Sequence, residues 1–170
     1  MDDRRRRFEA QALPHLDAAY NLARWLSRSP ADAEDIVQDA MLRAYRSFEG
    51  FRGDNPKAWV LTIVRNCWRD NVSAKMRHVH AALPEDGGDF PDVDARDPEQ
   101  IAIGAGEGRR LDAMIAGLAP EFREVLILRE IEEMSYRDIA AVTGTPIGTV
   151  MSRLARARTM LREKWAVESS

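Results

Sequence analysis

The chain has 170 residues, a formal net charge of −3 and 45% hydrophobic residues, a composition typical of a soluble globular protein. It contains no run of about 18 apolar residues, and its basic N-terminus lacks the apolar segment of a secretory signal, so we expect no membrane insertion and a cytoplasmic location. Cys67 is the single cysteine, which excludes an intrachain disulfide and a cysteine-based zinc cluster; we expect no metal and no cofactor.

The small net charge conceals three segments of opposite sign. Residues 51–80 carry six basic and two acidic side chains, and residues 145–165 carry five and one. Between them, residues 81–108 carry eight acidic side chains and one arginine, together with prolines and a Gly-Gly pair that disfavour regular structure. We therefore expect residues 1–80 and 109–170 to form separate domains, joined by a flexible acidic linker at 81–108.

The first domain is predicted to be a helical bundle. Apolar residues recur at helical spacing over residues 13–29 and 31–48. A third helix is expected from Asn55-Pro56 to about Arg77, since asparagine can cap free backbone N–H groups and proline fits the first helical position. The charged run Arg4–Arg7 is expected to be a disordered, solvated tail.

The second domain is also predicted to be helical, with one helix at about 109–118 and another that starts at Pro120. Ser135 is expected to cap a short helix, Gly144 to supply a tight turn, and Thr145-Pro146 to start the last helix. Two short helices joined by a glycine-containing turn make a helix-turn-helix. The expected fold is therefore all-α, with two small helical domains.

The last helix has two faces of different chemistry. Its buried stripe is expected to contain Ile147, Val150, Leu154, Ala157 and Leu161. The opposite face is polar and cationic and suits insertion into the major groove of DNA, where it would present Thr149, Ser152, Arg153 and Arg156. Arg158 is better placed for phosphates. The arginines alone leave a second interpretation open, a solvated basic helix end favoured by the helix dipole.

Two surfaces of the first domain also have a functional interpretation. The helix at 31–48 carries Asp35, Asp39, Arg43 and Arg46 along one face, which indicates either a docking surface for a basic partner or a solvated polar face. The segment Phe51–Asp70 places Trp59, Ile63, Asn66 and Asp70 on one helical face, flanked by Arg65 and Arg69. Aromatic, amide and cationic groups together suit unpaired bases, although the tryptophans can equally be core anchors.

The segments DAEDIVQDAMLRAYRSFEGFRGDNPKAWVLTIVRNCWRD and LAPEFREVLILREIEEMSYRDIAAVTGTPIGTVMSRLARAR, in this order, resemble bacterial sigma factors of the extracytoplasmic-function (ECF) type, in the sigma-70 family. The resemblance covers nearly all of residues 10–165. It implies a promoter-specificity subunit whose partners are core RNA polymerase, promoter DNA and an anti-sigma factor. The first domain would be the second conserved region of the family, and the second domain the fourth.

The resemblance also implies roles for particular residues. The residues matching the helix that docks on the clamp coiled coil of the polymerase's largest subunit are Asp35, Gln38, Asp39 and Arg43. The residues expected to read and open the −10 element are Phe51, Trp59, Arg65, Asn66 and Arg69, with Asn66 at a flipped base. In the set expected at the −35 element, Thr149, Ser152, Arg153, Arg156 and Arg158, the residues that match the family's usual contact positions are Ser152, Arg153 and Arg156. Met151 stands where the family commonly has lysine or arginine.

Two other functions are compatible with parts of the sequence, and an enzyme is a third option. A helix-turn-helix regulator that is not a polymerase subunit would explain the second domain but leave the Asp35–Asp39 face without a role. A sigma-like decoy that binds an anti-sigma protein would not need the arginines of the last helix. We expect no enzyme, since Cys67 has no sequence-evident base and the chain has no phosphate-binding glycine loop. Because a flexible linker permits but does not enforce two-site binding, we expect the free protein to bind promoters weakly.

Overall fold

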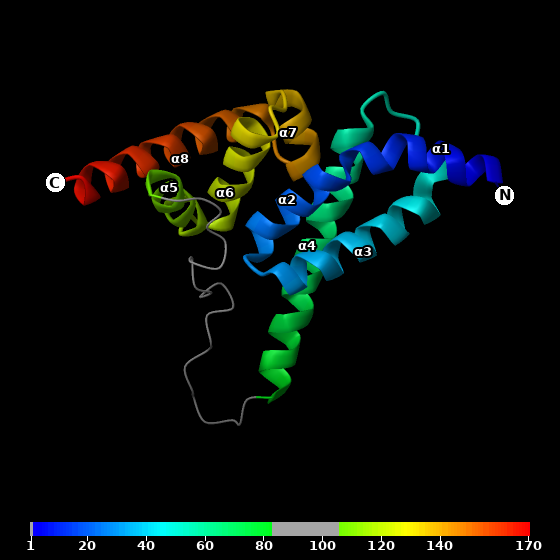
Figure 1. Cartoon of the computed structure of the whole chain (residues 1–170), viewed down its shortest axis with the longest axis horizontal. Coiled ribbons are helices and arrows are strands. Elements are labelled where there is room, and N and C mark those ends of the chain that lie inside the picture. The colour runs from blue at the N-terminus through cyan, green and yellow to red at the C-terminus, as the bar shows by residue number, and fades with distance from the viewer. Residues whose placement is uncertain (1, 83–105) are drawn as a thin grey trace.

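The computed structural model of the chain describes residues 2–82 and 106–170, and in these ranges it is helical throughout, with no strand (Figure 1). The first module contains α1 (Asp2–Ala12), α2 (Leu16–Ser27), α3 (Pro30–Ser47) and α4 (Pro56–Ala82), with short 3-10 turns at Leu13–His15 and Phe48–Gly50. The second contains α5 (Glu107–Ala116), α6 (Pro120–Leu126), a π-helical segment (Ile127–Ile131), α7 (Tyr136–Thr143) and α8 (Ile147–Glu168). The all-α prediction is confirmed; most of the expected linker lies outside the described residues.

The helices of the first module start where the sequence supplies caps. The side chain of Ser29 accepts a hydrogen bond from the backbone N–H of Asp32 at 3.3 Å, and that of Asn55 accepts one from Ala58 at 3.1 Å. Proline follows each capping residue at the first helical position. Helices α2, α3 and α4 pack against one another around a shared core whose fully buried members include Leu22, Leu26, Ile36, Leu61 and Val64.

The run Arg4–Arg7 is part of helix α1, so the prediction of a disordered tail was wrong. The apolar side of the helix explains the difference: Phe8 is buried and packs edge-on against the rings of Tyr45 and Phe48, with centroids 5.2 and 5.6 Å apart. Arg4 adds a hydrogen bond from its Nη2 to the carbonyl oxygen of Tyr45, at 2.8 Å. The buried ring of Phe8 thus holds this segment against the bundle, although the charge of the segment alone predicts a solvated tail.

The second module contains the expected helix-turn-helix in α7 and α8. The Ser135 side chain caps α7 by accepting a hydrogen bond from the N–H of Asp138, at 3.1 Å. Gly144 ends α7 with a φ of 65°, in the left-handed region that glycine adopts without strain. Helix α8 packs on α6 and on α7, and α7 also contacts the π-helical segment, through a buried set that includes Leu128, Ile139, Val142, Val150 and Leu154.

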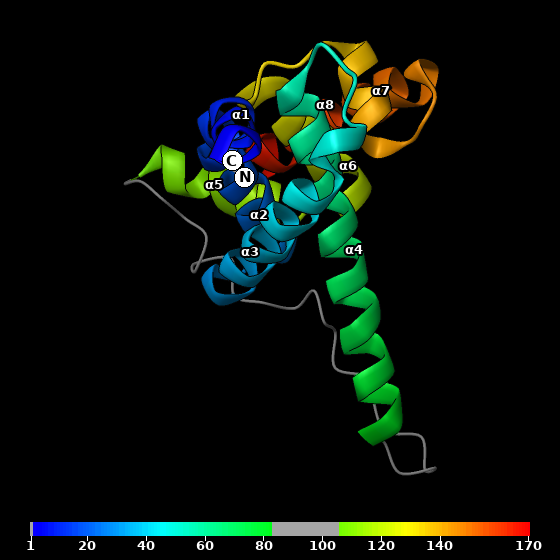
Figure 2. The same cartoon turned by 90° about the vertical axis from the view of Figure 1, so that its right-hand side faces the viewer.

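The two modules are in direct contact. Helix α2 packs against α6, and the first turns of α4 lie beside α7 (Figure 2). Arg123 of α6 is fully buried at this contact, and its guanidinium donates to the carbonyl oxygens of Ala116 and Leu118 at 3.0 Å and to that of Leu26, in the other module, at 3.3 Å. The buried apolar residues of both modules form one contiguous cluster.

None of the helices in the described ranges is long and apolar enough to cross a membrane.

Candidate functional site

The outer face of α8 is the first candidate surface. Val150, Leu154 and Ala157 are buried against the rest of the module, whereas Ser152 and Arg156 point to solvent. Thr149 and Arg153 flank them and are half-buried. Helical arithmetic therefore found the outer face, but it was wrong about Ile147, which is 45% exposed because the first residue of the helix lies beyond the contact with α6 and α7.

Two arginines of α8 have partners inside the module. The guanidinium of Arg156 lies 5.2 Å from the centre of the Phe122 ring, which leaves its N–H edge accessible. Arg158 donates from Nε and Nη2 to one carboxylate oxygen of Glu130, at 3.1 and 2.6 Å, and this hydrogen bond raises its pKa. Arg158 must therefore exchange a surface ion pair for any phosphate contact, a small cost because such pairs contribute little.

The second candidate surface lies on α4, where the expected −10 residues separate into three groups. Trp59 stacks on Phe51 with ring centroids 4.6 Å apart and planes at 25°, and both rings are half-buried against the core. Asn66 and Arg69 are exposed. Arg65 instead faces the second module, where its Nε and Nη2 donate to the two carboxylate oxygens of Glu124 at 2.7 and 3.2 Å.

Sequence reasoning missed two neighbours of Arg65 at the same contact. The Nζ of Lys57 lies 3.1 Å from a carboxylate oxygen of Glu132, and the Nδ2 of Asn55 donates to a carboxylate oxygen of Asp138 at 2.9 Å. The partners of these side chains lie in the other half of the chain. No local spacing could therefore have revealed the contacts.

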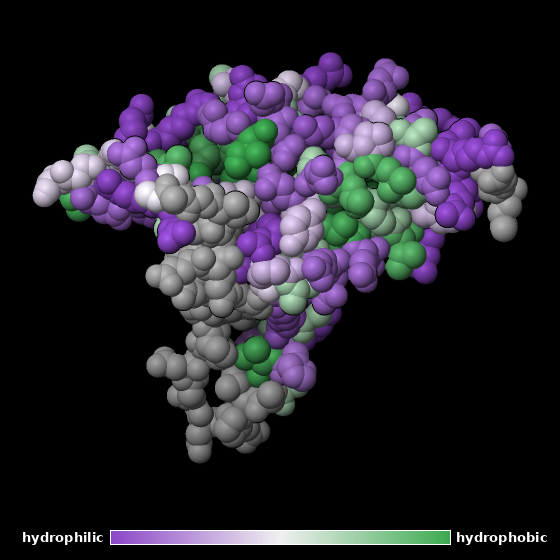
Figure 3. Space-filling view, in the orientation of Figure 1, coloured by the Kyte–Doolittle hydropathy of each residue, from purple (hydrophilic) through white to green (hydrophobic). Residues whose placement is uncertain are grey.

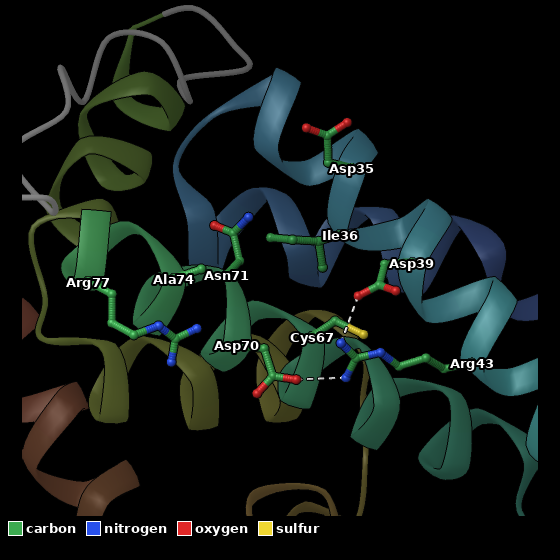
Figure 4. Close-up of a pocket in the computed structure, with 9 residues that line it drawn as sticks. All are labelled: Asp35, Ile36, Asp39, Arg43, Cys67, Asp70, Asn71, Ala74 and Arg77. Atoms are coloured by element: carbon green, nitrogen blue, oxygen red, sulfur yellow. Dashed lines mark hydrogen bonds and ion pairs between the residues drawn. The ribbon is translucent and has the colours of Figure 1, made fainter. Parts of the chain in front are cut away.

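The third candidate surface is a shallow groove of about 410 Å³ between α3 and α4 (Figure 4). Arg43 spans it, with Nη2 2.9 Å from a carboxylate oxygen of Asp39 and Nη1 2.7 Å from one of Asp70. The hydrogen bond to Asp70 raises the pKa of Arg43. Asp35 lies at the rim with its carboxylate directed away from this network. Of the expected docking residues, Asp39 and Arg43 are thus bound to each other.

Gln38 belongs to a different groove, of about 330 Å³, on the other side of α3. The groove is lined by side chains of α2 and α3, namely Leu16, Asp17, Tyr20, Glu34, Val37 and Gln38. Exposed apolar side chains gather on this side of the molecule, between α2 and α3, where the space-filling view shows a hydrophobic area (Figure 3). This groove therefore combines apolar side chains with the carboxylates of Asp17 and Glu34.

Cys67 lies at the base of the groove between α3 and α4 and is buried. Burial raises the pKa of its thiol to about 12, although the Arg43 guanidinium lowers it. The nucleophilic thiolate is therefore absent at neutral pH. The described parts of the chain also contain no group of three or more side chains suited to hold a metal ion.

These surfaces define an all-α protein with a helix-turn-helix at one end and a long polar helix in a second bundle. Residues 13–78 match the family model for sigma-70 region 2, and residues 108–161 match that for sigma-70 region 4. The chain belongs to the sigma-70 family, in its ECF group.

Curated relatives agree with this assignment. The chain is 38% identical over 92% of its length to the ECF RNA polymerase sigma factor SigE of Mycolicibacterium smegmatis, of which it spans 60%. It is 34% identical to the ECF RNA polymerase sigma-E factor of Haemophilus influenzae and 31% identical to that of Escherichia coli, and it spans 78% and 73% of these proteins.

Solved structures show the same fold. The sigma factor RpoE of Bartonella quintana, in complex with the anti-sigma factor NepR, has a TM-score of 0.75 at 31% identity, over 94% of this chain and 97% of that chain. CnrH, in complex with the cytosolic domain of CnrY, has a TM-score of 0.69 at 26% identity, over 96% and 90%.

We predict that Cys67 does not react with a maleimide in the folded protein at pH 8, because its thiol is buried and protonated, and that it reacts fully after unfolding in guanidinium. The folded pKa lies above the value near 9.0 of a free thiol, so this group stabilises the fold below that value, and the contribution is lost as pH rises toward 12. Mass spectrometry of the labelled chain measures the reaction. Rapid labelling of the folded chain at pH 8 would contradict the burial.

Proposed function

We propose that the chain is a promoter-specificity subunit that binds core RNA polymerase, reads the −35 and −10 elements and starts transcription without catalysing a reaction itself. The observation that carries the proposal is the outer face of α8, with Ser152 and Arg156 exposed opposite the fully buried Val150 and Leu154. A helix of this kind, about 10–12 Å across with its side chains, fits a major groove about 12 Å wide. In this assignment α8 reads the −35 element through Thr149, Ser152, Arg153 and Arg156, with Arg158 on phosphate.

The −10 element is assigned to α4. Exposed Asn66 carries an amide that can hydrogen-bond the edge of a flipped base, and exposed Arg69 supplies positive charge for the strand. Half-buried Trp59 and Phe51 already stack on each other, so a base would add to this pair at its exposed edge. Strand opening then depends on capture of the freed bases, since unstacking costs only a few kcal/mol per base.

The polymerase is assigned to α3. Gln38 is exposed on this helix, in the groove that also contains Leu16, Tyr20 and the acidic Glu34. Asp35 is exposed at the rim of the neighbouring groove between α3 and α4. Acidic groups beside an apolar groove suit a partner helix with basic and apolar side chains. At the neighbouring groove Arg43 pairs with Asp39 on its own helix and with Asp70 on α4, and the second pair holds α3 against α4.

An anti-sigma protein is the proposed regulator of the chain. This part of the proposal rests on the two solved relatives, one of which is in complex with the anti-sigma factor NepR and the other with the cytosolic domain of CnrY. A helix-turn-helix regulator that acts without polymerase is the second candidate, favoured by α7 and α8 alone. Addition of the chain to core polymerase separates the two, because only a sigma subunit directs initiation.

We predict that the purified chain directs core polymerase to specific start sites on genomic fragments, and that Asp35→Arg abolishes this activity by placing a positive charge on the docking surface. Co-purification with core polymerase and run-off transcription measure the two effects. Glu163→Arg makes the same change at an exposed residue of α8 and should keep polymerase binding. Co-purification of Asp35→Arg at the wild-type level would remove Asp35 from the docking surface.

We predict that Arg156→Ala weakens recognition of the −35 element by about 1–3 kcal/mol and relaxes its sequence preference, because a base contact is lost. Footprinting of the holoenzyme on wild-type and substituted −35 sequences measures both. Lys164→Ala removes an exposed charge farther along α8 and should weaken all sequences equally. An equal loss on all sequences for Arg156→Ala would assign this residue to phosphate.

We predict that Asn66→Ala impairs strand opening more than closed-complex formation, because the amide acts on a base only after unpairing. Permanganate reactivity of promoter thymines reports opening, and footprinting reports the closed complex. Ser73→Ala, at an exposed residue of the same helix, is the matched control. Normal permanganate reactivity in Asn66→Ala would place base capture elsewhere on α4.

A further inference from the structure

Helix α8 carries an exposed apolar row beside the polar face that the proposed function gives to DNA. Ile147 is 45% exposed, Met151 is 51% exposed, and the small side chain of Ala155 is exposed as well. The three residues are four positions apart, so they line up along one side of the helix. Ile147 and Met151 lie outside the hydrophobic core cluster. The row is therefore not part of what holds the module together.

This row begins at the start of the recognition helix. Ile147 is the first residue of α8, and Met151 lies about one turn further on. In helix-turn-helix proteins the N-terminal residues of the second helix contact base edges in the major groove. With a rise of about 1.5 Å per residue, the two side chains are about 6 Å apart along the helix axis, less than two base-pair steps. Both can therefore contact bases at neighbouring positions.

The surroundings of the row indicate the chemistry of its partner. Ser152 and Arg156 are exposed next to it, and Arg153 is half-buried on the far side of the same face. The row is one side chain wide, whereas an apolar surface that docks a protein usually extends over several hundred Å². A narrow apolar row beside positive charge suits the major groove of DNA, in which thymine presents its 5-methyl group.

Gly148 allows this part of α8 to approach the bases closely. It is exposed and follows Ile147 directly, and a Cβ added at this position would meet no atom within 4 Å. The lack of a side chain keeps the helix surface low at this point, as is common where a backbone lies close to a ligand. Ile147 and Met151 can then reach methyl groups on the floor of the groove.

Methionine limits the contacts that position 151 can make with DNA. A lysine or arginine there would bind phosphates through its charge, whatever the base sequence. The thioether of Met151 carries no charge and no N–H donor, and its flexible, polarizable side chain adapts to apolar groups. A contact between Met151 and DNA therefore distinguishes among bases instead of adding affinity for any duplex.

We propose that Ile147 and Met151 form an apolar ridge that reads thymine methyl groups in the −35 element and sets part of the promoter specificity of this chain. The inference deepens the proposed function and rests on the assignment of α8 to the −35 element. The ridge recognises thymine, while the neighbouring Ser152, Arg153 and Arg156 recognise the hydrogen-bonding edges of other bases.

The first test selects binding sites from promoter duplexes randomised across the −35 region, with holoenzyme assembled from core polymerase and the full chain. The wild-type chain should enrich thymine, on either strand, at one or two positions. Met151→Ala should lose the enrichment at one of these positions only. Val167→Ala shortens an apolar side chain that is 76% exposed in the last turn of α8, and it should keep the wild-type pattern.

The second test removes the methyl group and leaves the protein unchanged. Uracil has the hydrogen-bonding edge of thymine without the methyl, and it replaces each enriched thymine in turn. At the Met151 position the wild-type holoenzyme should lose affinity about fourfold, the effect of burying one methyl-sized group. Met151→Ala should lose clearly less than wild type, and Met151→Leu, of similar volume, should respond like wild type. Gel-shift titrations measure the affinities.

A charged variant checks that the contact is apolar. Met151→Lys should bind all duplexes more tightly than wild type, because the new charge reaches phosphate. Its affinity should fall more steeply with salt, by about one phosphate contact. It should respond to uracil as weakly as Met151→Ala does.

Three results would overturn the proposal. One is a selection that enriches thymine at no position of the −35 region. Another is an equal loss on uracil in wild type and in Met151→Ala, because the methyl group would then act through the shape of the duplex or through other side chains. The third is a loss of core polymerase binding in Met151→Ala, which would assign the ridge to a protein partner.

The uracil comparison is repeated on the full chain without polymerase at low salt, where phosphate contacts strengthen binding. This arm separates the inference from the proposed function. A chain that discriminates thymine from uracil in duplex DNA but never directs initiation would refute the function and keep the methyl contact. A chain that initiates equally well from thymine and uracil promoters would refute the methyl contact alone.

Discussion

The packing of the two modules against each other, at which Arg65 pairs with Glu124, is the constraint that positions every candidate surface of the described chain. This ion pair joins the two modules at their buried contact, beside the fully buried Arg123. Removal of one partner would leave the other charge buried, at a cost of about 3–5 kcal/mol, whereas separation of the modules returns both to water. The contact is therefore more sensitive to the loss of one partner than to the exposure of both.

This contact explains part of the uneven distribution of charge along the chain. A net charge of −3 would disfavour DNA binding if it were spread evenly over the surface of the protein. In the folded chain, acidic side chains of α6 and α7 face basic and polar ones of α4, while Ser152 and Arg156 of α8 stay exposed. The acidic groups therefore neutralise basic side chains of α4 and leave the outer face of α8 accessible.

Local signals in the sequence were sufficient to predict the helices and their caps, but they could not predict which helices contact one another. The caps at Asn55 and Ser135 and the left-handed Gly144 are read from neighbouring residues, and all three are confirmed. The partner of Arg65 lies 59 positions away, so helical spacing could predict the position of this arginine on α4 but not its ion pair. The error at Arg4–Arg7 has the same origin, since the rings that hold Phe8 come from α3 and the turn after it.

The central claim is that the two modules pack directly against each other in the chain. Spin labels at Ser73→Cys on α4 and Thr159→Cys on α8 occupy exposed sites, and the buried Cys67 does not compete for label. Pulsed dipolar spectroscopy should give one narrow distance between the labels in the free protein. A broad distance distribution would contradict the account.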